Sequence, residues 1–288
     1  MIAAERQDGP LALVCGGGTL PLAVADIVSK RGRKVLLFPL QGIAKPEDYA
    51  NRPHTWVRVA KFGKFERAAH AAGCNELVLI GSLVRPAFWQ MRFDLSTLML
   101  IPRIAAGFRG GDNFLLSRVT QLIEEKGFRV LGAHEVAPEI LVPSGSLGIV
   151  QPTERDNADI SFGFEYLHAT SAFDVGQAVV VANKHVLAVE AVEGTDQMLA
   201  RVAELRASGR IRAPVGSGIL VKAPKRQQDR RLDLPSIGPQ TVDGVMRAGL
   251  SGVAVAAGGT IVAEPTQVIQ AADRAGIFVV GVPSEPEQ

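Results

Sequence analysis

Leu11-Ala-Leu-Val-Cys-Gly-Gly-Gly-Thr-Leu-Pro21 is the stretch that decides the fold. Its first five residues form a continuous apolar run, which is typical of a strand covered on both faces. A glycine-rich turn follows, and the apolar residues from Leu20 to Lys30 then recur at helical spacing, with Gly32 as the C′ residue. Val35-Leu-Leu-Phe38 is the next apolar run. The order strand, helix, strand predicts a parallel sheet.

The same alternation continues through the first half of the chain and predicts an N-terminal, Rossmann-like, doubly wound parallel sheet. Its other expected elements are strands at 56–59, 76–80 and 129–131 and helices at 64–72 and 112–126, the second capped by Asp112. A stretch rich in Gly, Ser and Pro, residues 141–152, is the expected boundary. We therefore expect one domain over 1–142, a linker over 143–152 and a second α/β domain over 153–288.

The second half alternates again. Its expected strands are 177–181, 186–190, 219–221, 253–256 and 277–280, the first two joined at Asn183-Lys184. Its expected helices are 160–169, 196–206, 241–248 and 265–275, with Thr195 as the N-cap of the second.

Composition excludes several classes of protein. The chain has 288 residues, 47% of them apolar, and a formal net charge of +2, so charge does not indicate a nucleic-acid partner. No run of about 18 apolar residues suits a membrane span, and the acidic N-terminus does not resemble a signal peptide. Cys15 and Cys74 lie at or beside apolar strands. Two free, buried thiols fit a cytoplasmic protein.

The glycine turn after the first strand suits a phosphate, because backbone N–H groups and a helix N-terminus can approach an anion closely. A dinucleotide fingerprint requires a third glycine where Pro21 stands and an acid after the second strand, where Gln41 stands. The turn therefore predicts a phosphate, sugar or nucleotide site, or else only a tight turn. Arg85, which follows Gly81, is either a phosphate ligand or a surface arginine, and Asp112, beside Asn113, is either a ligand or a helix cap.

The most apolar segment runs from Phe88 to Phe108; Arg85 and Arg109 flank it, and Arg92 and Arg103 interrupt it. Its helical spacing indicates core or a dimer interface. The alternative is a surface that faces lipid, with arginines near the headgroups.

Residues 222–241 combine five basic residues, Asp229, Asp233 and three prolines between an apolar strand and a helix. Prolines stiffen a loop, and a stiff polar loop leaving a buried strand is a common place for chemistry. The simpler interpretation is a solvated basic loop.

A second group of carboxylates, Glu193 and Asp196, flanks Gly194 and Thr195 at an expected helix N-terminus. The simpler interpretation is a capped helix. Together with Asp229 and Asp233, however, these carboxylates suit Mg²⁺, which binds a few carboxylates plus substrate oxygens. The histidines lack zinc-site spacing, and no GxSxG motif indicates a serine hydrolase.

These motifs, in this order, resemble the LpxI family, the UDP-2,3-diacylglucosamine pyrophosphatases of lipid A (lipopolysaccharide) biosynthesis in some Gram-negative bacteria. The most specific are Glu193-Gly-Thr-Asp196 and Gln228-Asp-Arg-Arg-Leu-Asp-Leu-Pro235, and the resemblance covers the whole chain. It implies a hydrolase that splits the pyrophosphate into UMP and lipid X, with water attacking the α-phosphorus and a divalent cation, Mg²⁺ or another, assisting. It also implies a substrate bound between the two domains, a homodimer, and a cytoplasmic location with peripheral contact to the inner membrane.

The resemblance implies a catalytic aspartate, assigned to Asp233 ahead of Asp229, and Asp233 is also the candidate metal ligand. The remaining candidate catalytic residues are Lys222, Glu193 and Asp196. The candidate substrate-binding residues are Gly17, Gly18, Thr19, Leu20, Pro21, Gly81, Arg85, Asp112, Asn113, Gln177, Gly194, Thr195, Lys225, Gln228, Arg231 and Thr241.

Two other functions are weighed against this one. A nucleotide-dependent oxidoreductase would explain the first strand, helix and strand but not the departures from the dinucleotide fingerprint. A non-enzymatic nucleotide- or nucleic-acid-binding module would use the basic residues between Lys222 and Arg231. Neither explains the carboxylates at 193–196 and 229–233.

Overall fold

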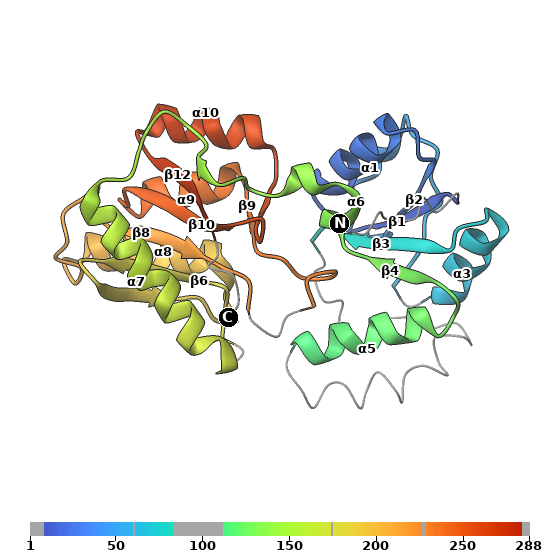
Figure 1. The fold of residues 1–288 in the computed structure, drawn as a ribbon, viewed down its shortest axis with the longest axis horizontal. Helices are drawn as coiled ribbons and strands as arrows, with labels where there is room; N and C mark the ends of the chain where they lie inside the picture. The colour runs from blue at the N-terminus through green and yellow to red at the C-terminus, as the bar shows by residue number, and fades with distance from the viewer. Residues whose placement is uncertain (1–8, 60, 83–111, 174, 226–228, 284–288) are drawn as a thin grey trace. The chain divides into compact units, whose positions relative to one another are not determined.

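The computed structural model describes residues 9–59, 61–82, 112–173, 175–225 and 229–283. The chain divides into two compact units, Met1–Pro138 and Glu139–Gln288. Each unit has its own sheet with helices packed on it (Figure 1). Within the described ranges, every helix is too short or too polar to span a bilayer.

The first unit contains a parallel sheet in the strand order β2-β1-β3-β4. Helices α1 and α6 lie on one face and α3 and α5 on the other (Figure 1), which is the doubly wound arrangement expected. Phe65 of α3 packs against Phe38 and Phe128 on this second face. The elements are β1 (Leu11–Cys15), α1 (Leu20–Lys30), β2 (Val35–Pro39), α2 (Pro46–Tyr49), α3 (Phe62–Ala71), β3 (Glu76–Ile80), α5 (Asp112–Glu124), β4 (Arg129–Leu131) and α6 (Ala133–Val136).

At the carboxyl edge of this sheet, the glycine turn packs directly on the end of β3. The Gly16 N–H donates to the Ile80 carbonyl, and Gly17 and Ser82 exchange two backbone hydrogen bonds of 2.8 and 2.9 Å. A Cβ added at Gly16 would lie 2.5 Å from the Ser82 carbonyl oxygen, and one added at Gly81 would lie 2.8 Å from the Gly17 carbonyl oxygen. The glycines therefore allow two backbones to meet side by side.

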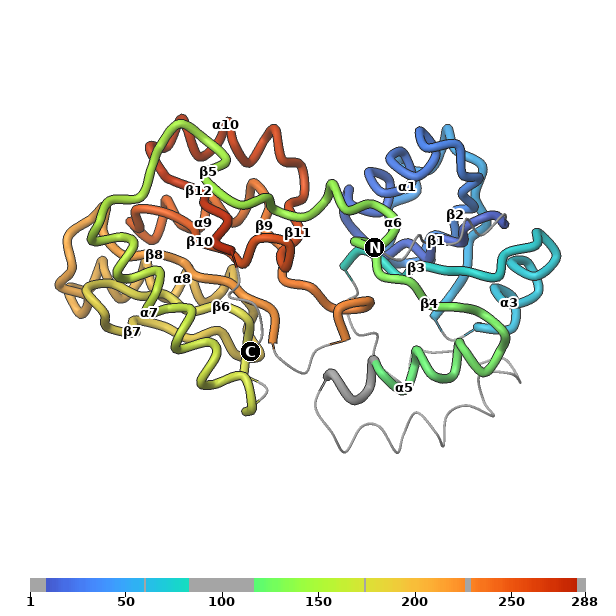
Figure 2. Tube along the Cα trace, viewed as in Figure 1, coloured from blue at the N-terminus to red at the C-terminus, as the bar shows by residue number. Residues whose placement is uncertain are grey.

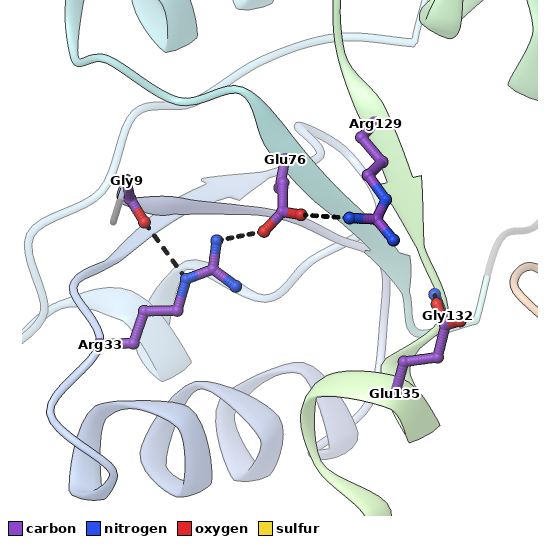
Figure 3. Close-up of polar contacts among 6 residues, drawn as sticks. All are labelled: Gly9, Arg33, Glu76, Arg129, Gly132 and Glu135. Atoms are coloured by element: carbon purple, nitrogen blue, oxygen red, sulfur yellow. Dashed lines mark hydrogen bonds and ion pairs between the residues drawn. The ribbon is translucent and has the colours of Figure 1, made fainter. Parts of the chain in front are cut away.

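At the opposite, amino edge, ion pairs fasten the strands (Figure 3). The Glu76 carboxylate is 5% exposed and accepts hydrogen bonds from Arg33 at 2.5 Å and Arg129 at 3.4 Å. A cavity of about 510 Å³ lies here, lined in part by these three side chains and by Phe128. Because both guanidinium groups are paired with Glu76, the cluster holds the sheet edge together.

Three expectations for the first unit were wrong in detail. Residues 56–59 do not form a strand: the chain there makes two isolated bridges to β2, at His54 and Val57. Thr55 and Val57 still donate to the Leu37 and Pro39 carbonyls at 2.9 and 3.0 Å, but the ladder is interrupted because Pro39 has no N–H to donate. Helix α3 begins two residues earlier than expected, and α5 begins at Asp112 as expected but ends at Glu124, before Lys126. Arg85 and the apolar segment from Phe88 to Phe108 lie outside the described residues.

The second unit contains a six-stranded mixed sheet in the order β5-β12-β10-β8-β6-β7. Side chains alternate between two cores. Val180 and Leu220 point toward the core with α8, α9 and α10, whereas Val179 and Val221 point toward α7. The elements are β5 (Gly145–Ser146), α7 (Glu154–Thr170), β6 (Ala178–Ala182), β7 (His185–Val189), α8 (Gly194–Ala207), β8 (Ile219–Lys222), β9 (Ser236–Ile237), α9 (Pro239–Arg247), β10 (Gly252–Ala257), β11 (Ile261–Val262), α10 (Pro265–Ala275) and β12 (Phe278–Pro283).

A buried carboxylate fixes the turn between β6 and β7. Asn183 and Lys184 both have positive φ, 55° and 56°, and their N–H groups donate to Asp159 of α7 at 2.8 and 2.6 Å. Asp159 is only 3% exposed. Figure 2 follows this part of the chain from α7 through β6 and β7 to α8. Fixing this turn also fixes where the opposite end of the hairpin lies, which is the amino end of β6 and the carboxyl end of β7.

Several boundaries in the second unit also differ from those expected. Helix α7 begins at Glu154 rather than at Ile160, because Thr153 and Asp156 form a capping box before it. Helix α8 begins at Gly194, so Thr195 lies in its first turn and is not the N-cap. The stretch 222–241 is not loop throughout. It includes β9, which pairs with β11, and the start of α9, where a proline needs no N–H partner.

Residues 143–152, expected as a linker, lie in the second unit. Strand β5 pairs with β12, and the Leu147 N–H donates to the Val279 carbonyl at 2.9 Å. Just before them, the Val142 N–H donates to the Thr260 carbonyl.

A pair of glycine substitutions tests the backbone contact in the first unit. Gly18 and Gly81 both have positive φ, 89° and 101°, but only a Cβ at Gly81 meets other atoms. We expect Gly18→Ala to lower the free energy of unfolding by about 1 kcal/mol through backbone strain. Gly81→Ala adds a clash and should cost about 3 kcal/mol. Urea unfolding followed by tryptophan fluorescence measures this, because Trp56 and Trp89 both belong to the first unit.

Equal costs for the two substitutions would contradict the close approach of the glycine turn to the end of β3.

Candidate functional site

The candidate site lies at one edge of the second sheet. Strand β6 is antiparallel to both β7 and β8, so the carboxyl ends of β7 and β8 lie beside the amino end of β6. Three polar residues occur at these ends: Glu190 directly follows β7, Lys222 is the last residue of β8, and Gln177 directly precedes β6. Every residue of β6 and β8 is buried, including those at this edge. The register of the sheet therefore brings these side chains together.

Lys222 is the buried charge of this edge. Its side chain is 6% exposed, and its Nζ donates to Thr195 Oγ1 at 3.0 Å and to the Ser236 carbonyl at 2.9 Å. Burial lowers the pKa of Lys222 below its ordinary value, and the charges of Glu190, Asp196 and Asp233 oppose that shift. The ammonium group is thus held by two oxygen acceptors and surrounded by negative charge.

Two chains of hydrogen bonds leave the Glu190 carboxylate. On one side, Thr195 Oγ1 donates to Glu190 Oε1 at 2.7 Å and accepts from Lys222. On the other, the backbone N–H of Gln177 donates to Glu190 Oε2 at 2.7 Å, and Gln177 Nε2 donates to Asp233 Oδ2 at 3.0 Å. Lys222, Thr195, Glu190, Gln177 and Asp233 therefore form one connected network.

Glu190 and the Ser236 carbonyl are the parts of this network that sequence reasoning did not select. Glu190 had a signal, because it is the first polar residue after the apolar run of β7. The contribution of Ser236 is a backbone carbonyl, so its residue type carries no signal.

Asp229 and Asp233 have different surroundings. Arg231 binds Asp229 with both Nε and Nη2, at 3.0 and 2.8 Å, and also donates its backbone N–H to the same carboxylate. This pairing holds the pKa of Asp229 below its ordinary value. Asp229 and Arg231 therefore brace their own loop, whereas Asp233 contacts Gln177.

Other predicted residues lie near this edge with structural partners of their own. Glu193 pairs with Arg201 at 3.1 Å; the Arg201 side chain is about half exposed and that of Glu193 is less so. Thr241 is buried, and its Oγ1 accepts the Gly238 N–H at the start of α9. Gly194 and Asp196 are in the first turn of α8. Lys225 lies three residues beyond β8, half-buried, and Gln228 lies outside the described residues.

The predicted residues of the first unit are at the carboxyl edge of the other sheet. The neighbours β1 and β3 are joined to flanking strands on opposite sides, which makes this a topological switch point, the usual ligand position in such sheets. Gly17 and Gly81 take part in the backbone contact between the glycine turn and the end of β3, whereas Gly18 and Thr19 are exposed. Leu20 and Pro21 begin α1, and Asp112 and Asn113 begin α5. The first unit thus offers an exposed turn at the edge where ligands bind.

The described carboxylates suit only one kind of metal site. Within the described part of the chain, no three His, Cys, Asp or Glu side chains gather into a metal-binding group. An ion held mainly by protein, such as structural zinc, therefore does not fit these residues. Mg²⁺ bound by one or two carboxylates and by substrate phosphate oxygens would fit, with Asp233 as the candidate protein ligand.

Comparisons with known proteins agree with this geometry. Residues 10–140 match the family model "LpxI N-terminal domain", and residues 143–280 match the model "LpxI C-terminal domain". The chain is 40% identical over 272 residues to the UDP-2,3-diacylglucosamine pyrophosphatase LpxI of Caulobacter vibrioides, an alignment that covers 94% of this chain and 97% of the relative. Most of each unit and all residues of the network fall within the matched regions, and the chain therefore belongs to the LpxI family.

Proposed function

We propose that the protein is a hydrolase that cleaves the pyrophosphate of UDP-2,3-diacylglucosamine into UMP and lipid X. The observation that supports this most is the network that joins a buried ammonium, Lys222, to a carboxylate, Asp233, at one sheet edge. Splitting a phosphoanhydride depends on neutralising charge and positioning water. The relative from Caulobacter vibrioides is named for this reaction.

In the proposed reaction, water attacks the α-phosphorus. A new bond forms between the water oxygen and that phosphorus, and the bond from the α-phosphorus to the bridging oxygen breaks. The bridging oxygen leaves with the bonding electron pair on the β-phosphate, which stays with the diacylated sugar as lipid X, and the attacking water releases a proton to solvent. Asp233 orients the water or the cation, and Lys222, with Lys225 and Arg231, offsets the negative charge of the diphosphate.

A divalent cation, Mg²⁺ by our proposal, would be held by Asp233 together with substrate oxygens. When bound, such an ion supplies positive charge to the phosphate oxygens and lowers the barrier to attack. Asp229 is the weaker candidate ligand, because Arg231 already occupies both of its oxygens.

Three further proposals accompany this function. A sugar with two acyl chains partitions into lipid, so we propose that the enzyme works in the cytoplasm, in peripheral contact with the inner membrane. We propose that the exposed turn of Gly18 and Thr19 takes part in binding the nucleotide sugar. Finally, we propose a homodimer, for which the apolar segment from Phe88 to Phe108 is the candidate interface or acyl-chain site.

The two aspartates provide a matched test of the catalytic assignment. We expect Asp233→Asn to lower kcat by about 100-fold or more, because a group that acts in the transition state is lost. Asp229→Asn should weaken the pairing with Arg231 and lower kcat by about tenfold at most. Steady-state turnover of UDP-2,3-diacylglucosamine, with circular dichroism as the check on folding, compares them. A larger loss for Asp229→Asn would reverse the assignment.

The position of attack is tested by turnover in ¹⁸O-labelled water. We expect the label in UMP, and we expect a chelator to abolish turnover that added Mg²⁺ restores. Label in lipid X would move the attack to the β-phosphorus, and full turnover in the chelator would remove the cation from the proposal. A wild-type protein that leaves the substrate intact would overturn the proposed function itself.

A further inference from the structure

Glu190 is held firmly at the sheet edge by its own backbone. Its N–H donates to the Ala178 carbonyl at 2.9 Å, and its carbonyl accepts the Gly176 N–H at 3.0 Å. The side chain rests on Gly176, where an added Cβ would come within 2.5 Å of Glu190 Cγ. The glycine thus leaves room for the carboxylate to lie along the strand ends.

Each oxygen of this carboxylate has a different partner. Oε1 accepts from the Thr195 hydroxyl of α8 at 2.7 Å, and Oε2 accepts the backbone N–H of Gln177, before β6, at 2.7 Å. An ionised carboxylate can only accept hydrogen bonds, and a hydroxyl has a single proton to donate.

It follows that Glu190 determines the direction of the Thr195 hydroxyl. Because its proton is used on Glu190, Thr195 Oγ1 presents a lone pair to its other neighbour, Lys222 Nζ, 3.0 Å away. Lysine is a donor with no acceptor. The ammonium is therefore fixed between Thr195 and the Ser236 carbonyl.

The second oxygen acts on the other side of the site. By holding the Gln177 backbone, Glu190 places the side-chain amide that donates to Asp233 at 3.0 Å. One carboxylate thus joins the two groups that the proposed reaction uses.

We infer that Glu190 is a positioning residue for hydrolysis of the diphosphate substrate: it orients the Lys222 ammonium through Thr195 and the Asp233 carboxylate through Gln177. This inference rests on the proposed function for its effect on turnover. It rests on the hydrogen-bond network alone for its effect on Lys222.

Glu190→Gln tests one side of the network selectively. The glutamine has one acceptor oxygen, which the Gln177 N–H requires, so its NH₂ group must face Thr195. The threonine hydroxyl would then have two donors beside it, the amide and the Lys222 ammonium, and its own proton would lose its acceptor on residue 190. The substitution keeps the size of the side chain but removes the acceptor that orients the Thr195 hydroxyl beside Lys222.

We expect Glu190→Gln to lower kcat at least about tenfold, the effect of one hydrogen bond to a charged group, and to leave KM within about threefold.

Thr195→Ser, which retains the hydroxyl, should stay within about threefold of wild type, whereas Thr195→Val should lose activity as Glu190→Gln does. In the Thr195→Val background, Glu190→Gln should cost less than about twofold more, because both act on Lys222 through one contact. Glu204→Gln, an exposed glutamate on α8, is the matched control.

The ¹⁵N NMR signal of the Lys222 ammonium gives a readout that does not need turnover. It is assigned by its loss in Lys222→Met, and we expect Glu190→Gln to shift it and Glu204→Gln to leave it in place. If wild type does not cleave the substrate, the proposed function fails, and this signal still decides the role of Glu190. An unmoved signal, or a kcat of Glu190→Gln within twofold of an active wild type, would overturn the inference.

Discussion

The burial of one positive charge governs the architecture of the site in the second unit. Removing an ammonium group from water costs several kcal/mol unless acceptors and opposite charges offset it. At the end of β8, Thr195, the Ser236 carbonyl and the charges of Glu190, Asp196 and Asp233 provide that compensation. Apolar residues in place of buried ionic groups often leave stability unchanged or improve it. A lysine at this place is therefore better explained by chemistry than by folding. Its contacts also couple the positions of α8, β7 and β9.

The fold meets this requirement through the register of the sheet. Because β6 runs antiparallel to β7 and β8, three strand ends meet at one edge. Asp159 fixes the turn at the other end of the β6–β7 hairpin, and Gly176 leaves the space that Glu190 occupies. In the first unit, glycines solve a different problem, since they allow the turn after β1 to contact the end of β3. Small residues thus occur where backbones or buried groups must approach closely, and the polar residues of the site occur where buried strands end.

Much of the fold follows from local patterns. The apolar runs and the glycines after helices give β1, α1, β3, β4 and α10 with their observed bounds. The segment 56–59 is not a strand, because Pro39 of β2 has no N–H with which to continue the hydrogen-bond ladder. For the site, the sequence identifies the loop of Asp229 and Asp233 but cannot separate their surroundings, which depend on the pairing with Arg231. The sequence marks Glu190 only as the first polar residue after an apolar run, and its place between Thr195 and Gln177 appears only once the register of the strands is known.

Replacement of Lys222 tests the central claim, that this buried charge is present for catalysis. Lys222→Met removes the charge and keeps the length of an unbranched chain, and Lys184→Met, at an exposed lysine of the same unit, is the control. The measurement is kcat with UDP-2,3-diacylglucosamine, alongside the circular dichroism spectrum. We predict that Lys222→Met folds and loses about 100-fold or more in kcat, while Lys184→Met matches wild type. A folded Lys222→Met protein that turns over within about fivefold of wild type would contradict the account.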